Sequence, residues 1–352
     1  MKIFVINPGS TSTKIALFDG VKCLWTDTQR YDADVLGRFG SIMDQEDFRY
    51  GEIKKTLDAR SAAGFDAVVG RGGLMKPIKG GAYRVSGAML RDLKAMTYGA
   101  HASSLGAPLA LRFTDGGKIP AFIVDPVVVD ELADEARLSG LPEIPRISVF
   151  HALNQKAVAR RAAADLKKPL AECGLVVAHM GGGVSVGAHE RGRVIDVNNA
   201  LDGEGPMSPE RSGSLPVGSL TSLCFSGKYT LKEIQKKING QGGLVAHLGT
   251  NDLREVEKRV AAGEQGATLV FKALAFQISK EIGSCAAVLK GAVDAVVLTG
   301  GLAFSDALCE RISDRVSFIA PVLRYPGEDE MQALAEGALR VLTGEEAPLE
   351  YV

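Results

Sequence analysis

Cysteine is scarce in this sequence, and its distribution excludes two kinds of site. The five cysteines are odd in number and scattered, at positions 23, 173, 224, 285 and 309, without a Cys-x-x-Cys pair. This pattern argues against a disulfide framework, and no Cys/His spacing suggests zinc. We therefore expect buried, reduced thiols and a cytoplasmic location.

Long apolar runs and an excess of one charge sign are also missing. No stretch reaches eighteen uninterrupted apolar residues, so no membrane span is predicted, and the chain begins directly with a strand-like run rather than a signal peptide. With 41 basic and 42 acidic residues the net charge is -1. Charge therefore gives no support for nucleic acid or an anionic membrane as a partner.

What is present is the composition of a folded α/β protein of more than one domain. The chain is 46% hydrophobic and 24% charged, which is enough apolar material for a large core. Its 352 residues exceed one ordinary core, so two domains of roughly 150 residues are expected.

The N-terminal segment is the most informative stretch. An apolar run from Ile3 meets Asn7-Pro-Gly-Ser-Thr-Ser-Thr-Lys14, and the chain becomes apolar again through Phe18. This pattern predicts strand, turn and strand. Hydroxyl groups, a lysine and backbone N–H groups without nearby carboxylates suit a phosphate. The spacing differs from that of the usual phosphate loop that opens a helix.

A second segment of the same kind lies near the middle of the chain, at Leu175–Gly187. Placing Asn7 on His179 without gaps matches Gly9 with Gly181 and Ala16 with Ala188. A third strand with glycines follows at Ala295–Ala303. We infer two related halves, each an α/β layer whose glycine-rich loop faces a common cleft.

Helical patterns fill most of the intervals. The expected helices are Ser86–Met96, Phe150–Leu166, a segment through Ile234–Ile238 that opens with a capping box at Thr230 and Glu233, a long and mostly buried helix at Ala267–Leu289, and Met331–Leu342. The segment Asn198–Ser219, around Arg211, has no periodicity. A loop of this length in a compact protein is usually functional or disordered.

Five motifs together resemble one known family. Asn7–Lys14, Phe150-His151, His179-Met-Gly-Gly-Gly183, Arg211-Ser-Gly213 and Thr299-Gly-Gly301 occur in this order in the acetate and butyrate kinases. The resemblance covers nearly the whole chain. Three segments resemble the butyrate kinase branch: Arg71-Gly-Gly-Leu74, Tyr98–Gly106 and Tyr325-Pro-Gly-Glu-Asp-Glu330.

The resemblance implies a fold and an activity. That family belongs to the superfamily of actin, sugar kinases and Hsp70, in which two duplicated ribonuclease-H-like domains surround a central nucleotide cleft. It implies an N-terminal domain at 1–148, a C-terminal domain at 149–328, and a last helix, about 329–352, that packs back on the first. It further implies ATP and Mg²⁺, a short-chain carboxylate as substrate, an acyl phosphate as product, and a homo-oligomer.

The resemblance also implies roles for individual residues. Arg71 would hold the carboxylate, and Arg211 and His151 would contact the transferring phosphoryl group. Asp125 would organise Mg²⁺ or its water, and Glu330 or Asp329 would be linked to the metal. The implied phosphate-binding residues are Asn7, Ser10, Ser12, Lys14, His179, Gly181, Gly182 and Gly183. The implied nucleotide-binding residues are Asp252, Arg254, Gly300, Gly301 and Leu302.

Several of these residues have ordinary structural explanations as well. Asp125 precedes a proline and could be a turn residue. Glu330 could complement the dipole of a helix N-terminus, and Asp252 could be an N-cap beside a surface charge pair with Arg254. His151 and His179 could be capping or packed side chains.

Two departures from the acetate pattern bear on the substrate. The acyl pocket implied by the resemblance comprises Gly73, Ala100, His101 and Phe150. Acetate kinases carry valine and leucine where this chain has Gly73 and Ala100. Smaller side chains would leave room for further methylenes, each worth about 0.8 kcal/mol when buried. We therefore expect butyrate, with isobutyrate, propionate or acetate as alternatives. A sugar kinase and a non-catalytic ATP- or acyl-sensing module remain the competing hypotheses.

Overall fold

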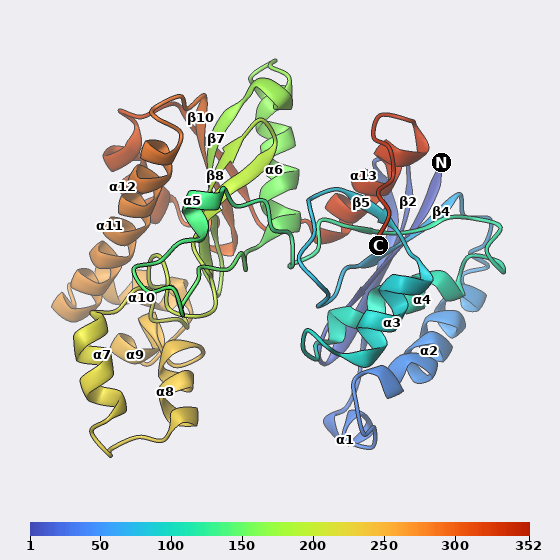
Figure 1. The fold of residues 1–352 in the computed structure, drawn as a ribbon, viewed down its shortest axis with the longest axis horizontal. Coiled ribbons are helices and arrows are strands. Elements are labelled where there is room, and N and C mark those ends of the chain that lie inside the picture. Colours follow the sequence, from blue (N-terminus) through green and yellow to red (C-terminus); the bar gives the residue numbers. More distant parts are fainter. The chain divides into compact units, whose positions relative to one another are not determined.

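Both predicted hairpins form, and each lies inside a β-sheet of its own (Figure 1). The computed structural model describes residues 1–352 and separates them into two compact units. Unit 1 consists of Met1–Val129 and Asp329–Val352, and unit 2 consists of Asp130–Glu328. Residues 130–148, which the sequence assigned to the N-terminal domain, therefore belong to unit 2, where the Ala133 N–H donates to the Ile195 carbonyl at 2.8 Å.

Unit 1 contains a six-stranded sheet in the order β3-β2-β1-β4-β6-β5. Its strands are β1 (Lys2–Pro8), β2 (Ser12–Asp19), β3 (Lys22–Arg30), β4 (Ala67–Arg71), β5 (Ala82–Arg84) and β6 (Ala121–Val124). Strands β1, β4 and β6 run parallel, so their carboxyl ends meet at one edge of the sheet.

Helices cover the sheet of unit 1. They are α1 (Ala33–Leu36), α2 (Glu46–Ala59), α3 (Gly87–Ala95), α4 (Gly106–Arg112) and α13 (Glu330–Leu342), with 3-10 turns η1 (Met43–Gln45) and η2 (Ala102–Leu105). Phe4 and Ile6 pack with side chains of α2 and α4 in one core. Strand residues alternate between faces, and α13 lies on the other face, where its Gly337 approaches Val124.

Unit 2 contains a five-stranded sheet in the order β11-β10-β7-β8-β9. Its strands are β7 (Gly174–Met180), β8 (Val184–Glu190), β9 (Arg193–Val197), β10 (Ala295–Gly300) and β11 (Val322–Pro326). Strands β7, β10 and β11 are parallel, and their carboxyl ends also share one edge.

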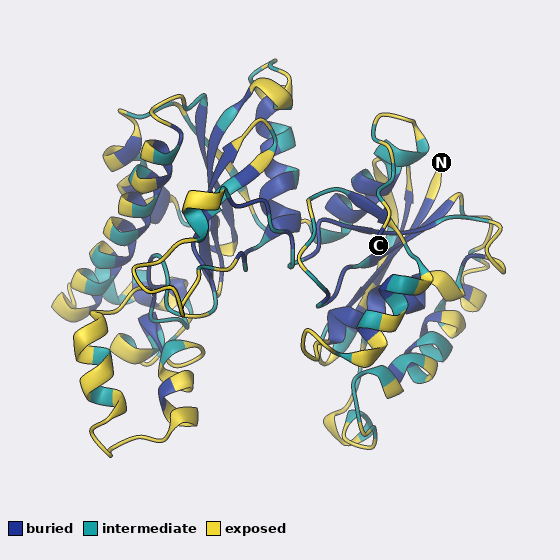
Figure 2. Ribbon diagram, viewed as in Figure 1, coloured by how far each residue is buried: buried dark blue, intermediate teal, exposed yellow.

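Helices lie on both faces of this second sheet, with α11 and α12 on one face and α6 on the other (Figure 1). The helices of unit 2 are α5 (Asp134–Arg137), α6 (Ala152–Asp165), α7 (Val217–Cys224), α8 (Leu231–Ile238), α9 (Gly243–Leu248), α10 (Leu253–Ala261), α11 (Gln265–Val288) and α12 (Asp306–Val316), with η3 (Leu170–Glu172) and η4 (Gly301–Phe304). The buried residues concentrate in the strands and the inner helix faces (Figure 2).

The two sheets repeat one strand order, which confirms the expected α/β fold with duplicated domains. The series β3-β2-β1-β4-β6 corresponds to β9-β8-β7-β10-β11. Asn7 pairs with Lys14 and His179 pairs with Ser185, so the second hairpin loop is one residue shorter. The gapless match of Ala16 with Ala188 is therefore wrong, because the equivalence shifts by one residue after the loop. The β-bulges at Leu17/Phe18 and Ala188/His189 agree with this shift.

One helix on each sheet follows the last strand of the other unit in the sequence. Helix α6 comes after β6 of unit 1 and packs on β7 and β10, whereas α13 comes after β11 of unit 2 and packs on β1, β4 and β6. The family resemblance implied that the last helix packs back on the N-terminal domain, and α13 does belong to unit 1.

The predicted helices form with small differences at their ends. Ser86 caps α3 by accepting from the Met89 N–H, and the capping box of Thr230 and Glu233 opens α8. Helix α11 is buried on one face only, since Leu269 is 69% exposed. Helix α7 begins at Val217, inside the segment expected to be a loop.

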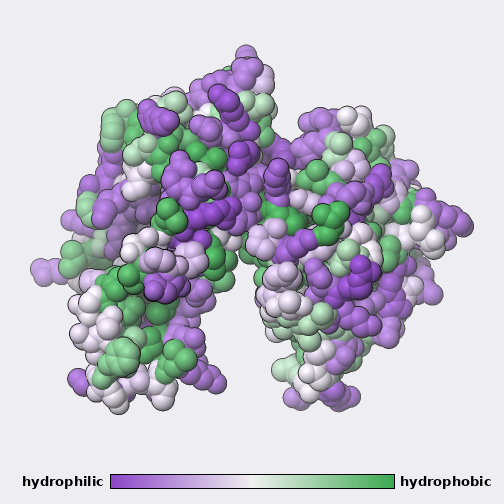
Figure 3. All heavy atoms as spheres, in the orientation of Figure 1, coloured by the Kyte–Doolittle hydropathy of each residue, from purple (hydrophilic) through white to green (hydrophobic).

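All five cysteines are free, but only three are buried, because Cys23 and Cys224 are exposed. The expectation that the thiols are buried is wrong for these two. None of the helices is long and apolar enough to cross a membrane. Hydrophobic residues also reach the surface at the end of unit 2 that α7 and α8 form, where Val217 and Phe225 are exposed (Figure 3).

Candidate functional site

The predicted phosphate loop of unit 1 is a four-residue turn, 9–12, which follows β1 and ends on Ser12, the first residue of β2. The Gly9 N–H donates to the Ser12 carbonyl at 2.7 Å and closes the turn. Ser10 and Lys14 are exposed and Ser12 is half-buried. Lys14 is paired with Asn7 across the hairpin, so both side chains lie on the same face.

Asn7, Arg71 and Glu330 form one connected group in unit 1. Arg71 Nη1 lies 2.6 Å from Glu330 Oε1, and Asn7 Nδ2 donates to Glu330 Oε2 at 2.8 Å. Arg71 Nη1 also donates to Asn7 Oδ1 at 3.4 Å. These residues stand at the ends of β1 and β4 and at the start of α13. An arginine and an amide thus hold a carboxylate at the sheet edge, which is the recognition that a carboxylate substrate needs.

Asp125 is buried at the same edge, directly after β6. Its Oδ1 accepts the Gly81 N–H at 2.7 Å, while its own N–H donates to the Gly81 carbonyl at 3.0 Å. Its φ of 38° is in the left-handed region, which Asp tolerates better than most residues but at some cost. A buried carboxylate in a sparsely populated conformation at a strand end fits a functional residue better than a plain surface turn.

Gly73 was expected to leave room in the acyl pocket, but a neighbouring residue fills this space in the structure. A Cβ built on Gly73 would lie 2.3 Å from Ser104 Cα and 2.6 Å from Ser104 Oγ. The space that a valine would fill is therefore occupied by Ser104 of η2, and the expected room for methylenes at this position is wrong. Ala100 is exposed, and its place in an acyl pocket stays a prediction.

His101 caps η2 and lies close enough to Arg71 for the arginine charge to affect the pKa of the imidazole. Its Nδ1 is 2.8 Å from Ser103 Oγ and accepts the Ser103 N–H at 3.2 Å. Partial burial, and secondarily the positive charge of Arg71, lower the pKa of His101. The imidazole is therefore neutral near pH 7. Phe150, the fourth predicted pocket residue, is buried in unit 2.

The predicted magnesium carboxylates have separate roles at the start of α13. Asp329 is the N-cap and accepts the Gln332 N–H at 3.4 Å, whereas Glu330 holds Arg71 and Asn7. The chain contains no group of three or more His, Cys, Asp or Glu side chains that could enclose a metal. One or two carboxylates together with substrate phosphates are the usual ligands of Mg²⁺, so this donor set fits the ion.

Two stacked histidines form the core of the candidate site in unit 2. The rings of His151 and His179 are parallel to within 8° with centroids 3.8 Å apart. His151 Nδ1 lies 2.9 Å from Ser185 Oγ, and His179 Nδ1 lies 2.7 Å from Asn154 Oδ1. Glu328 Oε1 is 3.0 Å from His179 Nε2, at ion-pair distance.

Helix α6 fixes these groups with its first turn. Gln155 Nε2 donates to the carbonyl and to Oγ of Ser185, both at 2.9 Å, and Gln155 Oε1 contacts His189 Nε2. Full burial lowers the pKa of His189 to about 3, so it is neutral and structural. His151 stands at the N-cap position of α6, where the helix dipole favours an anion.

The triple glycine 181–183 places Arg211. A Cβ on Gly183 would lie 1.7 Å from Arg211 Nη1, so the guanidinium rests directly on this glycine. Arg211 Nη1 donates to the Ala200 carbonyl at 2.6 Å, and Ser208 Oγ donates to the Gly182 carbonyl at 2.6 Å. Burial lowers the pKa of Arg211, which the nearby Glu210 and Asp202 partly offset.

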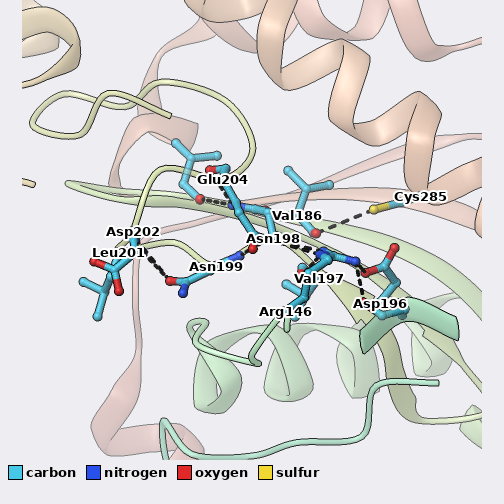
Figure 4. A network of polar contacts seen from close by, with 12 residues as sticks. Arg146, Val186, Asp196, Val197, Asn198, Asn199, Leu201, Asp202, Glu204 and Cys285 are labelled. Carbon is cyan, nitrogen blue, oxygen red and sulfur yellow. Dashed lines mark hydrogen bonds and ion pairs between the residues drawn. The ribbon is translucent and has the colours of Figure 1, made fainter. Parts of the chain in front are cut away.

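The start of the non-periodic segment after β9 is ordered by a network of polar contacts (Figure 4). Asn198 Oδ1 accepts the Val186 N–H at 2.7 Å, and Asn198 Nδ2 donates to the Val184 carbonyl at 3.0 Å. Arg146 joins Asp196 at 2.8 Å and Glu204 at 3.4 Å. These bonds tie the first residues of the segment, 198–204, to β8 and β9.

The predicted nucleotide residues separate into two groups. Gly300 has a φ of 87° and would collide with the Met180 backbone if it carried a Cβ, while Gly301 has open space around its Cα. Asp252 caps α10 and pairs with Arg254, which is 84% exposed. This pair therefore has the structural role of a cap and a surface ion pair, and its contact with a nucleotide stays a prediction.

Several residues that hold the side chains or loops of these sites in place do not stand out in the sequence. Asn154, Gln155, Ser185 and Glu328 position the two histidines, and Arg49 lies beneath the first loop. Only the periodicity of α6 could have found two of them, since Asn154 and Gln155 follow His151 within one helical turn.

One family model and several solved structures are similar to this chain. A family model described as the acetokinase family matches residues 143–318, half of the chain. The crystal structure of Porphyromonas gingivalis acetate kinase is similar, with a TM-score of 0.78 and 20% identity over 96% of this chain and 98% of that chain. A propionate kinase from Francisella tularensis subsp. tularensis SCHU S4 has a TM-score of 0.73 and 19% identity, with the same coverage. Entamoeba histolytica acetate kinase also has a TM-score of 0.73, at 15% identity and again over 96% and 98% of the chains. These likenesses confirm the two-domain α/β fold.

Proposed function

This chain belongs to the acetokinase family, and from that premise we propose that it phosphorylates butyrate with ATP, giving butanoyl phosphate and ADP. Family membership indicates a phosphotransferase that acts on the carboxyl group of a short-chain acid and uses ATP. The choice of butyrate is the finer part of the proposal.

The observation that carries the proposal is the carboxylate held by Arg71 and Asn7. Glu330 shows that this pair grips both oxygens of a carboxylate, at 2.6 and 2.8 Å. A short-chain acid carries the same group, already ionised at neutral pH. We propose that the acid takes over this grip, with Arg71 as the residue that orients it.

The transfer itself needs no strong base. A carboxylate oxygen forms a bond to the γ-phosphorus while the bond between that phosphorus and the bridging oxygen of ADP breaks. The difficulty is the approach of two anions, so cations and oriented donors have to stabilise the moving charge. We assign this role to Lys14 and the 9–12 loop in unit 1, and to Arg211, His151 and the triple glycine in unit 2.

Glu330, with Asp329 beside it, would hold Mg²⁺ together with the ATP phosphates. The ion supplies positive charge at the phosphates when it is bound. Asp125 is the second candidate for ordering the ion or its water, because its carboxylate is buried at the same sheet edge.

The preference for butyrate is supported by Ala100 and by the resemblance of the Tyr98–Gly106 and Tyr325–Glu330 segments to the butyrate kinase branch. Since Ser104 occupies the space at Gly73, Ala100 is the one small residue that still supports a longer acyl chain.

The test is an acid panel with purified protein. MgATP is supplied with acetate, propionate, butyrate, isobutyrate, valerate or glucose, and acyl phosphate is trapped as hydroxamate while ADP is measured separately. We expect the highest kcat/KM with butyrate and no product when Mg²⁺ is chelated. A clear preference for acetate would reject butyrate, ADP release with glucose would indicate a sugar kinase, and no turnover with any acceptor would favour the binding module.

A further inference from the structure

Arg49 of α2 is fully buried beneath the phosphate loop of unit 1. Its Nη1 donates to the carbonyls of Gly9 at 2.8 Å and Ser12 at 3.1 Å. Its Nη2 donates to the Ser10 carbonyl at 3.3 Å. One guanidinium therefore holds three carbonyls of the four-residue loop from the protein side.

The fourth carbonyl of the loop is also held from the protein side. The Thr11 carbonyl accepts the Tyr31 N–H at 3.0 Å, and the Tyr31 ring lies 4.9 Å from the Arg49 guanidinium carbon. The N–H groups of Ser10 and Thr11, in contrast, donate to no group of the chain. With every carbonyl bound inside, the loop offers N–H and hydroxyl donors to a ligand, which is the arrangement that an anion needs.

The charge of Arg49 has no carboxylate partner. Its neighbour Gln45, also buried, accepts from Nε at 3.1 Å and from Nη2 at 2.8 Å through the amide Oε1. Burial lowers the pKa of Arg49, but an arginine stays protonated at neutral pH. A buried charge without a counter-ion is costly, and glutamate at position 45 could supply one with the same length and the same acceptor atom.

We propose that Arg49 is a positioning residue for the phosphate loop and its buried source of positive potential, and that the neutral Gln45 leaves this charge available to a phosphoryl anion. Arg49 does not touch the ligand; it acts through the loop carbonyls and through its field. The proposal rests on the proposed function only in taking a phosphoryl group as the ligand of the loop.

Gln45→Glu tests the electrostatic part, because it keeps the acceptor for Nε and Nη2 and adds one negative charge. Gln45→Met is the matched control, since it removes the acceptor and leaves the charge of Arg49 unbalanced. The probe is inorganic phosphate, and the readouts are its dissociation constant by calorimetry and the thermal midpoint with and without it.

We expect Gln45→Glu to keep or raise the midpoint of the free protein while weakening phosphate binding about tenfold or more, because the added negative charge repels the phosphate. Gln45→Met should lower the midpoint and change phosphate binding by less than about threefold. Unchanged phosphate binding in Gln45→Glu would overturn the proposal, as would an equal loss in both variants.

Arg49→Lys provides an independent measurement, because it keeps the charge but cannot reach all three carbonyls with one planar group. It should bind phosphate more tightly than Arg49→Met at low salt, and the difference should shrink as salt screens the charge. Equal binding by these two variants would count against the field of Arg49. Since no acid is present in these experiments, their outcome is separate from that of the acid panel.

Discussion

Only glycine fits at position 183, because the side chain of Arg211 lies directly against its Cα. The guanidinium of Arg211 lies where a methyl group on Gly183 would stand, at 1.7 Å from Nη1. Gly182, its neighbour in the same loop, would place a methyl group 3.8 Å from Glu210 Oε2, an ordinary contact. Substitutions at these two glycines therefore distinguish an effect on the placement of Arg211 from a general need for a flexible loop.

We expect Gly183→Ala to lower kcat for acyl phosphate formation by roughly 100-fold, because Arg211 has to leave the position from which it would stabilise the phosphoryl group. Gly182→Ala should remain within a few-fold of the parent. Hydroxamate assays and thermal midpoints of both variants measure this. Equal activity of the two variants would remove Arg211 from its proposed role.

At this scale the sequence was informative wherever a motif was contiguous. Asn7, Arg71, Asp125 and Glu330 meet at one sheet edge, as their motifs indicated. Arg49 could not be found in this way, because its contacts lie 36 to 40 residues away in a loop without any charged partner. Arg49 continues the buried face of α2 that Ile53 and Leu57 form, but an arginine at such a position is expected to be exposed unless a loop covers it.

Single helices show a second kind of constraint, in which glycine allows close packing. Gly337 of α13 faces β6, and a Cβ there would lie 2.5 Å from Val124 Cγ1. Gly283 occupies the interior of α11 and has no atom within 4 Å of such a Cβ. Both are interior helix positions, so their intrinsic helix propensities are comparable, and only the packing differs.

Alanine at these two positions should change stability in opposite directions. Gly337→Ala is expected to destabilise unit 1 by about 1–2 kcal/mol, because the cost of overpacking exceeds the gain in propensity. Gly283→Ala should stabilise by about 0.5–1 kcal/mol. Urea unfolding followed by circular dichroism measures both. Stabilisation of the same size in both variants would show that α13 does not pack as closely on β6.

The ends of helices could be predicted from nearby residues in the sequence, whereas the exposure of side chains could not. The capping box at Thr230 and the cap at Ser86 were predicted and are present, because both depend on side chains within three residues. The exposure of Leu269 in α11, and the helix at Val217–Cys224, depend on what packs against these segments. Such contacts are set by the tertiary structure, which apolar periodicity alone does not determine.

For the whole molecule, the sequence indicated the duplication by a repeated pattern of apolar strand, small-residue loop and strand, with few identical residues. Its firm evidence is the common strand order and the bulges that share the one-residue shift. A gapless alignment could not detect that shift, because a hairpin loop can change length while both strands keep their pairing. The exchange of α6 and α13 between the units does not follow from a helix pattern, which does not indicate which sheet the helix covers. The family resemblance, however, implied that the last helix returns to the first domain, and α6 and α13 lie in the units it implied.

This exchange predicts which fragments fold. Unit 2 is continuous, so residues 130–328 should form a folded protein with a cooperative thermal transition. Residues 1–129 should not, because they lack α13, whose Leu334, Ala335 and Ala338 are buried on the sheet of unit 1. Joining 329–352 to 1–129 through a long flexible Gly/Ser linker should restore the cooperative transition, and the same fusion with Leu334→Asp is the control that should fail. If 1–129 alone unfolded as cooperatively as the fusion, the C-terminal helix would not be part of the core of unit 1.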